Sequence, residues 1–364
     1  MEVKRRLRLP YSIAKYSPIN HAHRATFAQK LSLEAAPWVR QAKFTTSEYR
    51  PSMTPLVTVI VPTFNRRATI MSALESALRQ DCPSFEVIIV DDGSTDGTGD
   101  FLRSQSYSVP VYVIQQSENG GPAAARNLAI SLASGKYVAF LDSDDQWLPE
   151  KLAKQVAAME QCTNPDKVIL YSRTRVLQRG RSIVRPIEPM ADGEDLADYL
   201  FLNQGYIPMP AVMITTKTAR QTPFQPQLRL HEDWDWYIRL WQTGVRFVML
   251  PEVLSVIDDR ASHNRASNPR PEQSFSVLEN WRSMISHRAY LARRAQVAPQ
   301  LRTTRPFKAL RFVLEAYVAG AISTWSLFVL MGRLAHPGLN EIACWTRDAL
   351  NRPAMLAAIY FLPL

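Results

Sequence analysis

The sequence predicts an α/β fold in which a mostly parallel sheet is covered by helices on both faces. Three observations lead to this expectation: short β-branched, almost wholly apolar runs recur along the chain, amphipathic helical segments lie between them, and polar or glycine-containing motifs directly follow the runs. With 364 residues and 46% hydrophobic composition, the chain can bury a sizeable core. This composition excludes a disordered protein.

The first predicted strand covers residues 57–61, where Val-Thr-Val-Ile-Val is nearly all apolar and Pro62 closes the run. A helix over residues 68–80 should follow, because its apolar residues recur at spacings of three and four and form one stripe that faces the sheet. The stripe consists of Ile70, Ala73, Leu74, Ala77 and Leu78. Together the two elements make one β-α unit.

The same cycle repeats as far as residue 141. The repeat consists of strands over 85–90, 111–114 and 137–141, a short helix after Thr95 and a longer helix over 122–133. Pro122 suits the first turn of that longer helix, where its missing N–H costs nothing, and Gly135 suits the position just past the helix end. The pattern is typical of half of a doubly wound α/β domain.

Regularity decreases after this repeat. A helix over 149–161 and a strand over 168–171 precede a segment, residues 172–230, in which six prolines interrupt any long element. Irregular segments of this kind beside a nucleotide fold often shape the pocket of a second substrate. Order returns with a helix over 232–242 and a strand over 246–250.

The C-terminal region is predicted to be helical. Residues 273–295 have a basic helical character, and residues 309–331 hold the longest apolar stretch, with Arg311 and Glu315 near one end. That stretch is long enough to span a bilayer, but its two charges favour a membrane-surface or re-entrant helical pair. A buried helical hairpin against the core is the alternative, and the apolar run over 355–364 is too short to cross.

Basic segments flank an acidic centre. Residues 1–55 carry 10 Lys and Arg against 3 Asp and Glu, residues 56–259 carry 19 against 25, and residues 260–364 carry 14 against 5. Basic flanks indicate an anionic surface as partner, either lipid or nucleic acid, or simply a solvated surface. Because no nucleic-acid reader motif is present, we expect an anionic membrane surface and no nucleic acid.

Three cysteines, far apart and without metal or redox spacing, indicate a reducing compartment. No apolar stretch of signal-peptide length follows the N-terminus. The expected location is therefore the cytoplasm, peripheral at the inner face of the cell membrane. The expected divisions are a basic N-terminal arm (1–55), a central domain (56–265) and a basic, helical and partly apolar C-terminal region (266–364).

Two acidic motifs carry the expected chemistry. Asp91-Asp92-Gly93-Ser94 follows the second strand, and Asp142-Ser143-Asp144-Asp145 follows the strand over 137–141. Like charges crowded at strand ends repel one another, so a fold that keeps them normally supplies a positive partner. A divalent metal carrying a phosphate is the natural candidate.

Four motifs occur in order at the strand ends, where open α/β sheets bind ligands: residues 61–66, 90–98, 118–127 and 141–145. The series strongly resembles the nucleotide-sugar-binding half of the family 2 glycosyltransferases with the GT-A fold. The resemblance covers residues 56–160 closely and extends loosely to residue 265. It implies a Rossmann-like GT-A domain whose first half, 56–160, binds a nucleotide sugar and whose second half, 161–265, binds the acceptor.

The resemblance also implies which residues meet the donor. The turn after the first strand and the first acidic pair hold the nucleoside, the glycine loop approaches the ligand, and the Asp-X-Asp signature binds Mg²⁺ or Mn²⁺. The expected nucleotide-sugar-binding residues are Pro62, Thr63, Asn65, Asp91, Asp92, Asn119, Gly120, Gly121, Arg126, Asp142 and Ser143. The expected metal ligands are Asp144 as the direct ligand, then Asp142, Asp145 and His263.

Residues 230–236, Leu-His-Glu-Asp-Trp-Asp-Trp, look like the Glu-Asp motif of that family. Carried over, Asp233 is the general base that deprotonates the acceptor hydroxyl during in-line attack, and Glu232 and Asp235 support it. Alternatively, acidic residues at the start of a helix only favour its dipole. The two tryptophans of this motif either stack on a sugar or pack in the core.

Several implied roles have structural alternatives. Asp92 could begin a turn and cap the following helix. Arg126 could be an ion-pair partner of Asp91 or Asp142 instead of a nucleotide contact. His263 could be a free loop histidine, because Ile-Asp-Asp-Arg over residues 257–260 stands where the family often has Tyr-Arg.

The function implied by the resemblance is that of an inverting glycosyltransferase. It moves a sugar from a nucleotide diphosphate sugar, expected to be a UDP-sugar, to a carbohydrate or lipid-linked acceptor in bacterial polysaccharide or glycolipid biosynthesis. A non-catalytic nucleotide-sugar-binding scaffold of the same fold is the alternative. A dinucleotide-dependent oxidoreductase is not expected, because no Gly-X-Gly-X-X-Gly follows the first strand.

Overall fold

The computed structural model describes residues 43–45, 54–178, 180–203, 205–259 and 270–335. These described residues belong to one compact unit. Of the predicted N-terminal arm, β1 (Lys43–Thr45) is described and pairs antiparallel with β4 (Val111–Gln115). The sequence predicted no helix or strand in this arm, but the arm adds a short strand to one edge of the sheet.

Four parallel strands form the first half of the sheet, and each contains one of the apolar runs of the sequence. They are β2 (Val57–Thr63), β3 (Phe85–Asp91), β4 and β5 (Tyr137–Phe140). β2 lies between β3 and β5, and β3 pairs with β4, so the spatial order is β4-β3-β2-β5. Every residue of β2 and β3 is buried, as expected for parallel strands covered on both faces.

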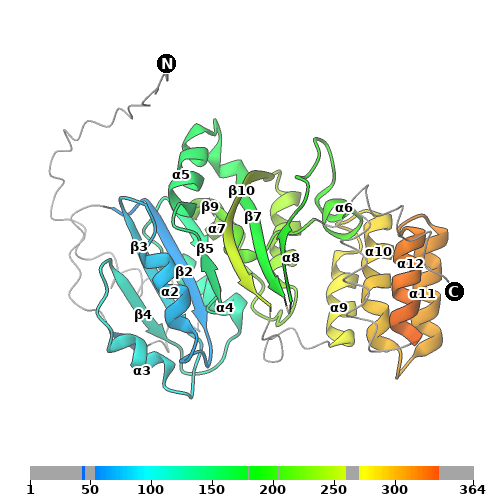
Figure 1. Cartoon of the computed structure of the whole chain (residues 1–364), viewed down its shortest axis with the longest axis horizontal. Helices are drawn as coiled ribbons and strands as arrows, with labels where there is room; N and C mark the ends of the chain where they lie inside the picture. The colour runs from blue at the N-terminus through cyan, green and yellow to red at the C-terminus, as the bar shows by residue number, and fades with distance from the viewer. Residues whose placement is uncertain (1–42, 46–53, 179, 204, 260–269, 336–364) are drawn as a thin grey trace. The chain divides into compact units, whose positions relative to one another are not determined.

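Helices alternate with these strands, which confirms the expected α/β arrangement (Figure 1). They are α2 (Ile70–Leu78), α3 (Thr98–Arg103), α4 (Pro122–Leu132) and α5 (Lys151–Gln161). The buried side of α2 is the stripe that the spacing predicted, and Pro122 lies in the first turn of α4. Local periodicity was therefore sufficient to locate this half of the fold.

The second half of the sheet is mixed, and its strands continue the order as β9-β7-β10-β6, with β8 pairing β7. These strands are β6 (Asp145–Trp147), β7 (Val168–Gln178), β8 (Arg181–Arg185), β9 (Met213–Thr215) and β10 (Arg246–Asp258). The sequence pattern predicted that β10 ends at Leu250, but the strand continues beyond Pro251 to Asp258. The pairing with β7 shifts register there and then resumes, since a proline removes one donor without ending the strand.

Short helices occupy the remainder of this half. They are α6 (Leu196–Phe201), α7 (Thr216–Gln221) and α8 (Glu232–Gln242), with single 3₁₀ turns at Pro165–Lys167 and Met209–Ala211. α8 has the bounds expected from the sequence. The proline-broken segment 172–230 holds the end of β7, all of β8 and β9, and two of the short helices.

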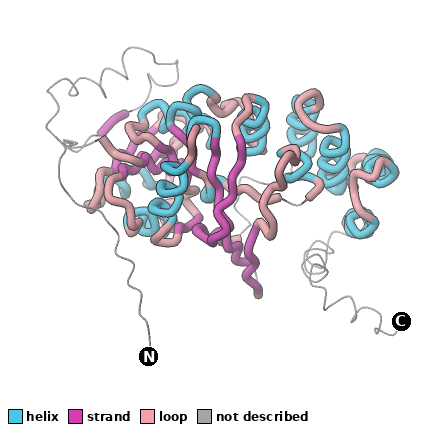
Figure 2. The backbone as a smooth tube through the Cα atoms, turned by 90° about the horizontal axis from the view of Figure 1, so that it is seen from above, coloured by secondary structure: helices cyan, strands magenta, loops and turns pink. Residues whose placement is uncertain are grey.

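Residues 270–335 contribute helices, whereas the strands are gathered within residues 43–258 (Figure 2). The helices are α9 (Pro271–Trp281), α10 (His287–Val297), α11 (Pro306–Val318) and α12 (Thr324–Ala335), with a 3₁₀ turn at Ala298–Leu301. The basic segment 273–295 is therefore helical as expected, but it is divided in two. Ser286 causes the division by capping α10, where its Oγ accepts from the backbone N–H of Ala289 at 3.0 Å.

The apolar stretch over 309–331 forms two helices and not one, because the chain turns at Gly320, where φ is +65°. Among the described residues, no helix combines the length and the apolar content needed to cross a bilayer. One side of α11 packs through Ala309, Phe312, Val313 and Ala316, whereas only Leu330 of α12 is fully buried. The pair is a hairpin with one packed side and one apolar side that faces outward.

We predict that Gly135→Ala lowers the free energy of unfolding by about 1–3 kcal/mol, because the added methyl group overpacks a buried backbone contact. A Cβ at this position would lie 2.5 Å from the backbone N of Thr58 and 2.7 Å from the carbonyl carbon of Val57. Urea unfolding measures the change. The exposed neighbour Ser134 provides the control: Ser134→Ala should stay within about 0.5 kcal/mol, and an equal loss in both variants would contradict this explanation.

Candidate active site

The candidate site lies at the carboxyl ends of the first four parallel strands. The sheet order reverses between β2 and β5, and ligands of open α/β sheets bind outside such a switch point. All the motifs found in the first half of the sequence leave the sheet at this edge. The fold therefore brings together the groups that the sequence presented as separate motifs.

The turns after β2 and β3 are joined by Asn65. Its backbone has φ of +52°, its N–H donates to Ser94 Oγ at 2.8 Å, and its Oδ1 accepts from the N–H of Thr95 at 2.9 Å. Asn tolerates this left-handed conformation better than most residues. Pro62 and Thr63 precede it as buried residues of β2.

The two carboxylates of the first acidic pair accept hydrogen bonds from two different loops. Asp92 accepts from the N–H groups of Gly120 and Gly121, both at 2.7 Å, so it holds the glycine loop. Asp91 is fully buried, and its Oδ1 accepts from the N–H of Ser94 at 3.1 Å. Burial is the main reason why the pKa values of both carboxyl groups are raised. The contacts of Asp92 differ from the helix-capping alternative, since its partners belong to a distant loop.

The glycine loop is fixed from a second side by Arg229. Its guanidinium donates to Oδ1 of Asn119 at 2.8 Å and to the backbone O of Asn119 at 3.1 Å. Gly121 has φ of +86°, and a Cβ there would lie 2.5 Å from Nη1 of Arg229. The loop therefore needs glycine for its backbone conformation and for this close approach.

Three adjacent strand ends carry buried polar atoms that have no hydrogen-bond partner among the described residues. They are Thr63 Oγ1 at the end of β2, Asp91 Oδ2 at the end of β3 and Gln116 Oε1 directly after β4. Buried polar atoms without partners are uncommon in folded proteins and need an explanation. Hydrogen-bond donors of a bound ligand would satisfy them. Gln116 was missed in the sequence, although its position directly after a strand was an available signal.

Arg126 of α4 joins the two halves of the site. Its Nη2 donates to Asp142 Oδ1 and its Nη1 donates to Glu232 Oε1, both at 2.9 Å, and the arginine side chain is only 5% exposed. Burial works against the charged form, but Asp142 and Glu232 outweigh it and hold the pKa of Arg126 above its usual value. The ion pair with Asp142 was one of the alternatives for this arginine, whereas the bridge to Glu232 was not expected.

The second acidic motif presents its residues differently. The side chains of Asp142 and Asp144 are each 30% exposed, and Asp144 Oδ2 lies 3.4 Å from Nη2 of Arg66. Asp145, at the start of β6, is 5% exposed, and Ser143 is also buried. Within the described residues, no group of three His, Cys, Asp or Glu residues is arranged to hold a metal ion. Asp142 and Asp144 are therefore the accessible carboxylates of the motif.

The second part of the site begins at α8. His231 precedes the helix with φ of +61°, and Glu232 and Asp233 form its first turn. Burial raises the pKa of Asp233 to about 7, helped by the neighbouring Glu232. A carboxyl with this pKa is matched to proton transfer near neutral pH.

The C-terminal helices hold this turn in place. Trp281 Nε1 of α9 donates to Asp235 Oδ1 at 3.1 Å, and Ser274 of α9 lies 2.9 Å from Nε2 of His231. Asp235 also pairs with Arg239 at 2.7 Å, so its two oxygens have structural partners. Trp236 is fully buried, which agrees with the core alternative for that residue. His263 lies outside the described residues.

Comparison with known proteins identifies the family. A family model described as "Glycosyl transferase family 2" matches residues 58–222. The amylovoran biosynthesis glycosyltransferase AmsB of Erwinia amylovora is 32% identical over 203 residues, which are 54% of this chain and 67% of AmsB. The chain belongs to glycosyltransferase family 2. The family resemblance stated from the motifs is thus confirmed.

Two further comparisons extend this family assignment. The Escherichia coli protein WfaP, named as a UDP-Glc:α-D-GlcNAc-diphosphoundecaprenol β-1,3-glucosyltransferase, is 42% identical over 105 residues, which are 29% of this family 2 chain and 41% of WfaP. The crystal structure of Staphylococcus aureus TarS 1–349 in complex with UDP-GlcNAc has a TM-score of 0.54 and 21% identity, and covers 77% of this chain and 87% of TarS 1–349. The GT-A fold is confirmed.

We predict that Arg126→Met lowers the free energy of unfolding by roughly 2–4 kcal/mol, because it leaves Asp142 and Glu232 without their shared counter-ion. The expected loss of free energy of unfolding is smaller than for a fully buried ion pair, because Asp142 is partly exposed. Chemical denaturation measures the change. The matched control is Arg79→Met, whose pair with Glu75 is exposed and worth less than about 1 kcal/mol. Equal losses in the two variants would show that the bridge is not a stabilising element.

Proposed function

We propose that this chain is an inverting glycosyltransferase that moves a sugar from a UDP-sugar to an acceptor hydroxyl in bacterial polysaccharide or glycolipid biosynthesis. One observation carries the proposal: Arg126 connects Asp142 of the donor-side motif to Glu232, the neighbour of a carboxyl whose pKa is about 7. A general base near neutral pKa beside a nucleotide-sugar site is the arrangement that a single displacement needs.

The donor half of the proposal rests on the strand ends. Thr63, Asp91 and Gln116 present unpartnered buried atoms, and a carboxylate oxygen such as Asp91 Oδ2 can accept from the imide N–H of uracil. TarS has been crystallised with UDP-GlcNAc, and the name of WfaP gives UDP-Glc as its donor. We therefore assign UDP as the nucleotide, with Pro62, Asn65, Asn119, Gly120, Gly121 and Ser143 shaping the site around it.

A divalent cation fits this site when it shares its ligands with the diphosphate. Mg²⁺ usually keeps waters and is held by one or two carboxylates plus substrate phosphates, so a cage of three protein ligands is not required. Asp144 and Asp142 provide accessible hard oxygens for Mg²⁺ or Mn²⁺, while the buried Asp145 is less suited. When bound, the cation would offset the charge that develops on the departing nucleoside diphosphate.

Asp233 would act on the acceptor. In its ionised form it would remove the proton of the attacking hydroxyl while the hydroxyl oxygen bonds to the anomeric carbon from the side opposite the diphosphate. The bond between that carbon and the diphosphate oxygen breaks in the same step, and the nucleoside diphosphate leaves with the electron pair. Glu232 raises the proton affinity of Asp233, and Arg126 lowers it, so the bridge tunes the base as well as positioning it. The non-catalytic scaffold does not explain why a carboxyl with a strongly raised pKa is kept beside the donor-side motif.

We predict that Asp233→Asn lowers turnover by about 10²–10⁴-fold while UDP binding in the presence of Mn²⁺ is unchanged, because an amide cannot accept the proton. In the unchanged enzyme, kcat/KM should rise with pH through about 7 and then level off, since the base must be ionised. Radiolabelled sugar transfer measures turnover, and calorimetry measures UDP binding. The control is Asp100→Asn, at an 87% exposed side chain of α3. Full turnover by Asp233→Asn would show that Asp233 is not the general base.

The same substitution has a stability consequence. Asp233 binds its proton more tightly when folded than when unfolded, so the free energy of unfolding should fall as pH rises from about 4 to 7. Asp233→Asn lacks this contribution. The free energy of unfolding of the variant minus that of the wild-type protein should therefore be larger at pH 8 than at pH 4. This comparison also shows whether the variant is folded.

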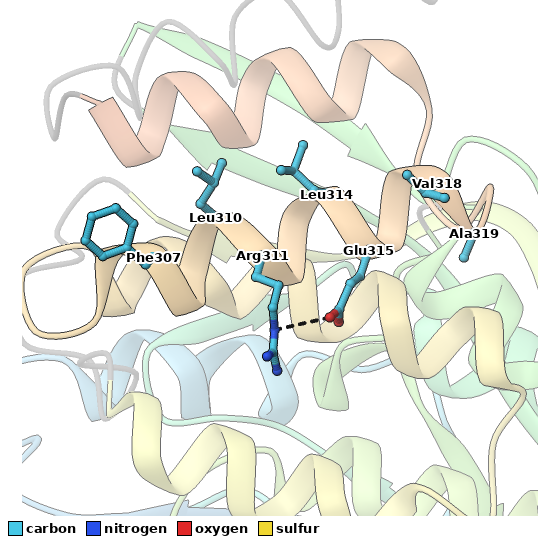
Figure 3. Close-up of a pocket in the computed structure, with 7 residues that line it drawn as sticks. All are labelled: Phe307, Leu310, Arg311, Leu314, Glu315, Val318 and Ala319. Carbon is cyan, nitrogen blue, oxygen red and sulfur yellow. Dashed lines mark ion pairs between the residues drawn. The ribbon is translucent and has the colours of Figure 1, made fainter.

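We also propose that the enzyme docks on the cytoplasmic face of an anionic membrane through α11 and α12, where a lipid-linked acceptor would lie. α11 lines a groove of about 520 Å³ with Phe307, Leu310, Leu314 and Val318 along one side (Figure 3). Phe307 and Val318 are 86% and 85% exposed, and Phe328 of α12 is 65% exposed. Exposed apolar groups on this scale mark an interaction surface.

The charge beside this surface selects anionic lipid as its occupant. Arg305, Lys308 and Arg311 are exposed on or beside the same helix, and Arg311 is paired with Glu315 at 3.2 Å. Apolar side chains that enter the headgroup region beside basic side chains bind bilayers through burial and through attraction to anionic headgroups.

We predict that the protein sediments with phosphatidylglycerol vesicles and much less with phosphatidylcholine vesicles at low salt. The double variant Phe307→Ser/Phe328→Ser should reduce the binding at least about 10-fold, because it removes two large apolar groups from the contact. Val248→Ser, at a 40% exposed valine on β10, serves as the control. No binding to anionic vesicles, or an equal reduction in the control, would refute this docking surface.

A further inference from the structure

One cation of the acceptor side has no role in the proposed transfer. Arg293 is a half-buried residue of α10 and reaches from the C-terminal helices to the start of α8. Its guanidinium carbon lies 4.4 Å from the ring centre of Trp234 and 5.7 Å from that of Phe201. Trp234 directly follows Asp233 in the chain, so this cation stands next to the candidate base.

Arg293 has no ion-pair partner among the described residues. Its polar contacts are Gln296 Oε1 at 3.3 Å and Nε2 of His231 at 3.5 Å. His231 cannot compensate the charge, because burial and the nearby Arg293 lower its pKa to about 3 and keep it neutral. The neighbouring Arg294 differs, since its guanidinium pairs with Glu315. The carboxyl of Asp233 attracts this guanidinium through space but forms no direct ion pair with it. A partly desolvated arginine without a directly paired carboxylate is a costly feature, and an anionic ligand would offset that cost.

The orientation of Arg293 is fixed while most of its donors are available. The aromatic rings of Trp234 and Phe201 hold the planar guanidinium, and only two of its five N–H donors have the contacts named above. A guanidinium held by its faces presents its edge, and that edge matches two oxygens of a phosphate. This arrangement resembles a prepared anion site more than a structural ion pair.

We propose that Arg293 binds a phosphate group of the acceptor and thereby selects an acceptor sugar that is linked to a diphosphate. The inference rests on the proposed function, because it needs the acceptor hydroxyl to lie at Asp233. A sugar attached to a lipid through a diphosphate carries its charge within about one sugar ring of the reacting hydroxyl. The guanidinium of Arg293 lies over the ring of Trp234, the residue that follows Asp233, and is therefore placed to meet this charge.

The C-terminal helices would then interact with two parts of the acceptor, its phosphate and its lipid. α10 supplies the arginine for the phosphate, while α11, which packs against α10, belongs to the surface proposed to meet the membrane. A lipid-linked acceptor has its lipid in the bilayer and its phosphates at the bilayer surface. Both features of the substrate are thus matched by one helical region.

The test compares binding of two ligands that differ only in the phosphates: a short-chain alkyl N-acetylglucosaminyl diphosphate and the corresponding alkyl N-acetylglucosaminide. We expect the unchanged protein to bind the diphosphate more tightly in calorimetry. Arg293→Gln should weaken that binding by about 10- to 100-fold and leave the alkyl glycoside nearly unchanged, because one charge-assisted contact is lost. Arg293→Lys should recover only part of the preference, since an ammonium lacks the paired donors.

Arg294→Gln is the matched control, because it removes an arginine from the adjacent position of the same helix and should keep the preference for the diphosphate. A loss of preference in both variants, a preference that survives Arg293→Gln, or weaker UDP binding in Arg293→Gln would overturn the inference. The last result would assign Arg293 to the donor. Because these are binding measurements, a selective loss in Arg293→Gln supports the anion site even if transfer is absent, in which case the proposed function fails alone.

Discussion

The double ion pair of Arg126 is the interaction on which the candidate site depends. It neutralises two carboxylates that would otherwise repel each other, one after β5 and one at the start of α8. Because the arginine is almost fully buried, water screens these attractions only weakly. The planar guanidinium uses separate nitrogens for the two partners, which an ammonium group could not do at the same distances. The position of the acidic motif after β5 relative to the first turn of α8 is therefore set by one side chain.

A second constraint acts on the turn that precedes α8. His231 adopts a left-handed backbone conformation that non-glycine residues rarely take, and such strain persists only where surrounding contacts enforce it. Ser274 contacts the imidazole, and Trp281 bonds to Asp235 one turn further on. The C-terminal helices thus fix the first turn of α8, which carries Asp233, as the sheet edge fixes the loops that follow β2, β3 and β5.

The site also carries a stability cost that its chemistry explains. Burying the carboxyl of Asp233 beside Glu232 disfavours its ionised form, which destabilises the fold above the ordinary pKa of an aspartate. The same burial brings the pKa of Asp233 close to the value that the general base proposed above needs at neutral pH.

The first half of the fold and the polar motifs at its strand ends could be predicted from local sequence alone. The strands, the stripe of α2 and the polar residues after each strand are local features, since periodicity and turn residues act over a few neighbours. Other features could be found only in the folded chain: the bridge from Arg126 to Glu232, the approach of Arg229 to Asn119 and the position of Arg293 beside Trp234. The length of β10 beyond Pro251 and the turn within the apolar C-terminal stretch belong to the same group. These depend on pairings between segments far apart in the chain, where a charge or an aromatic ring finds its partner only after the sheet and helices have packed.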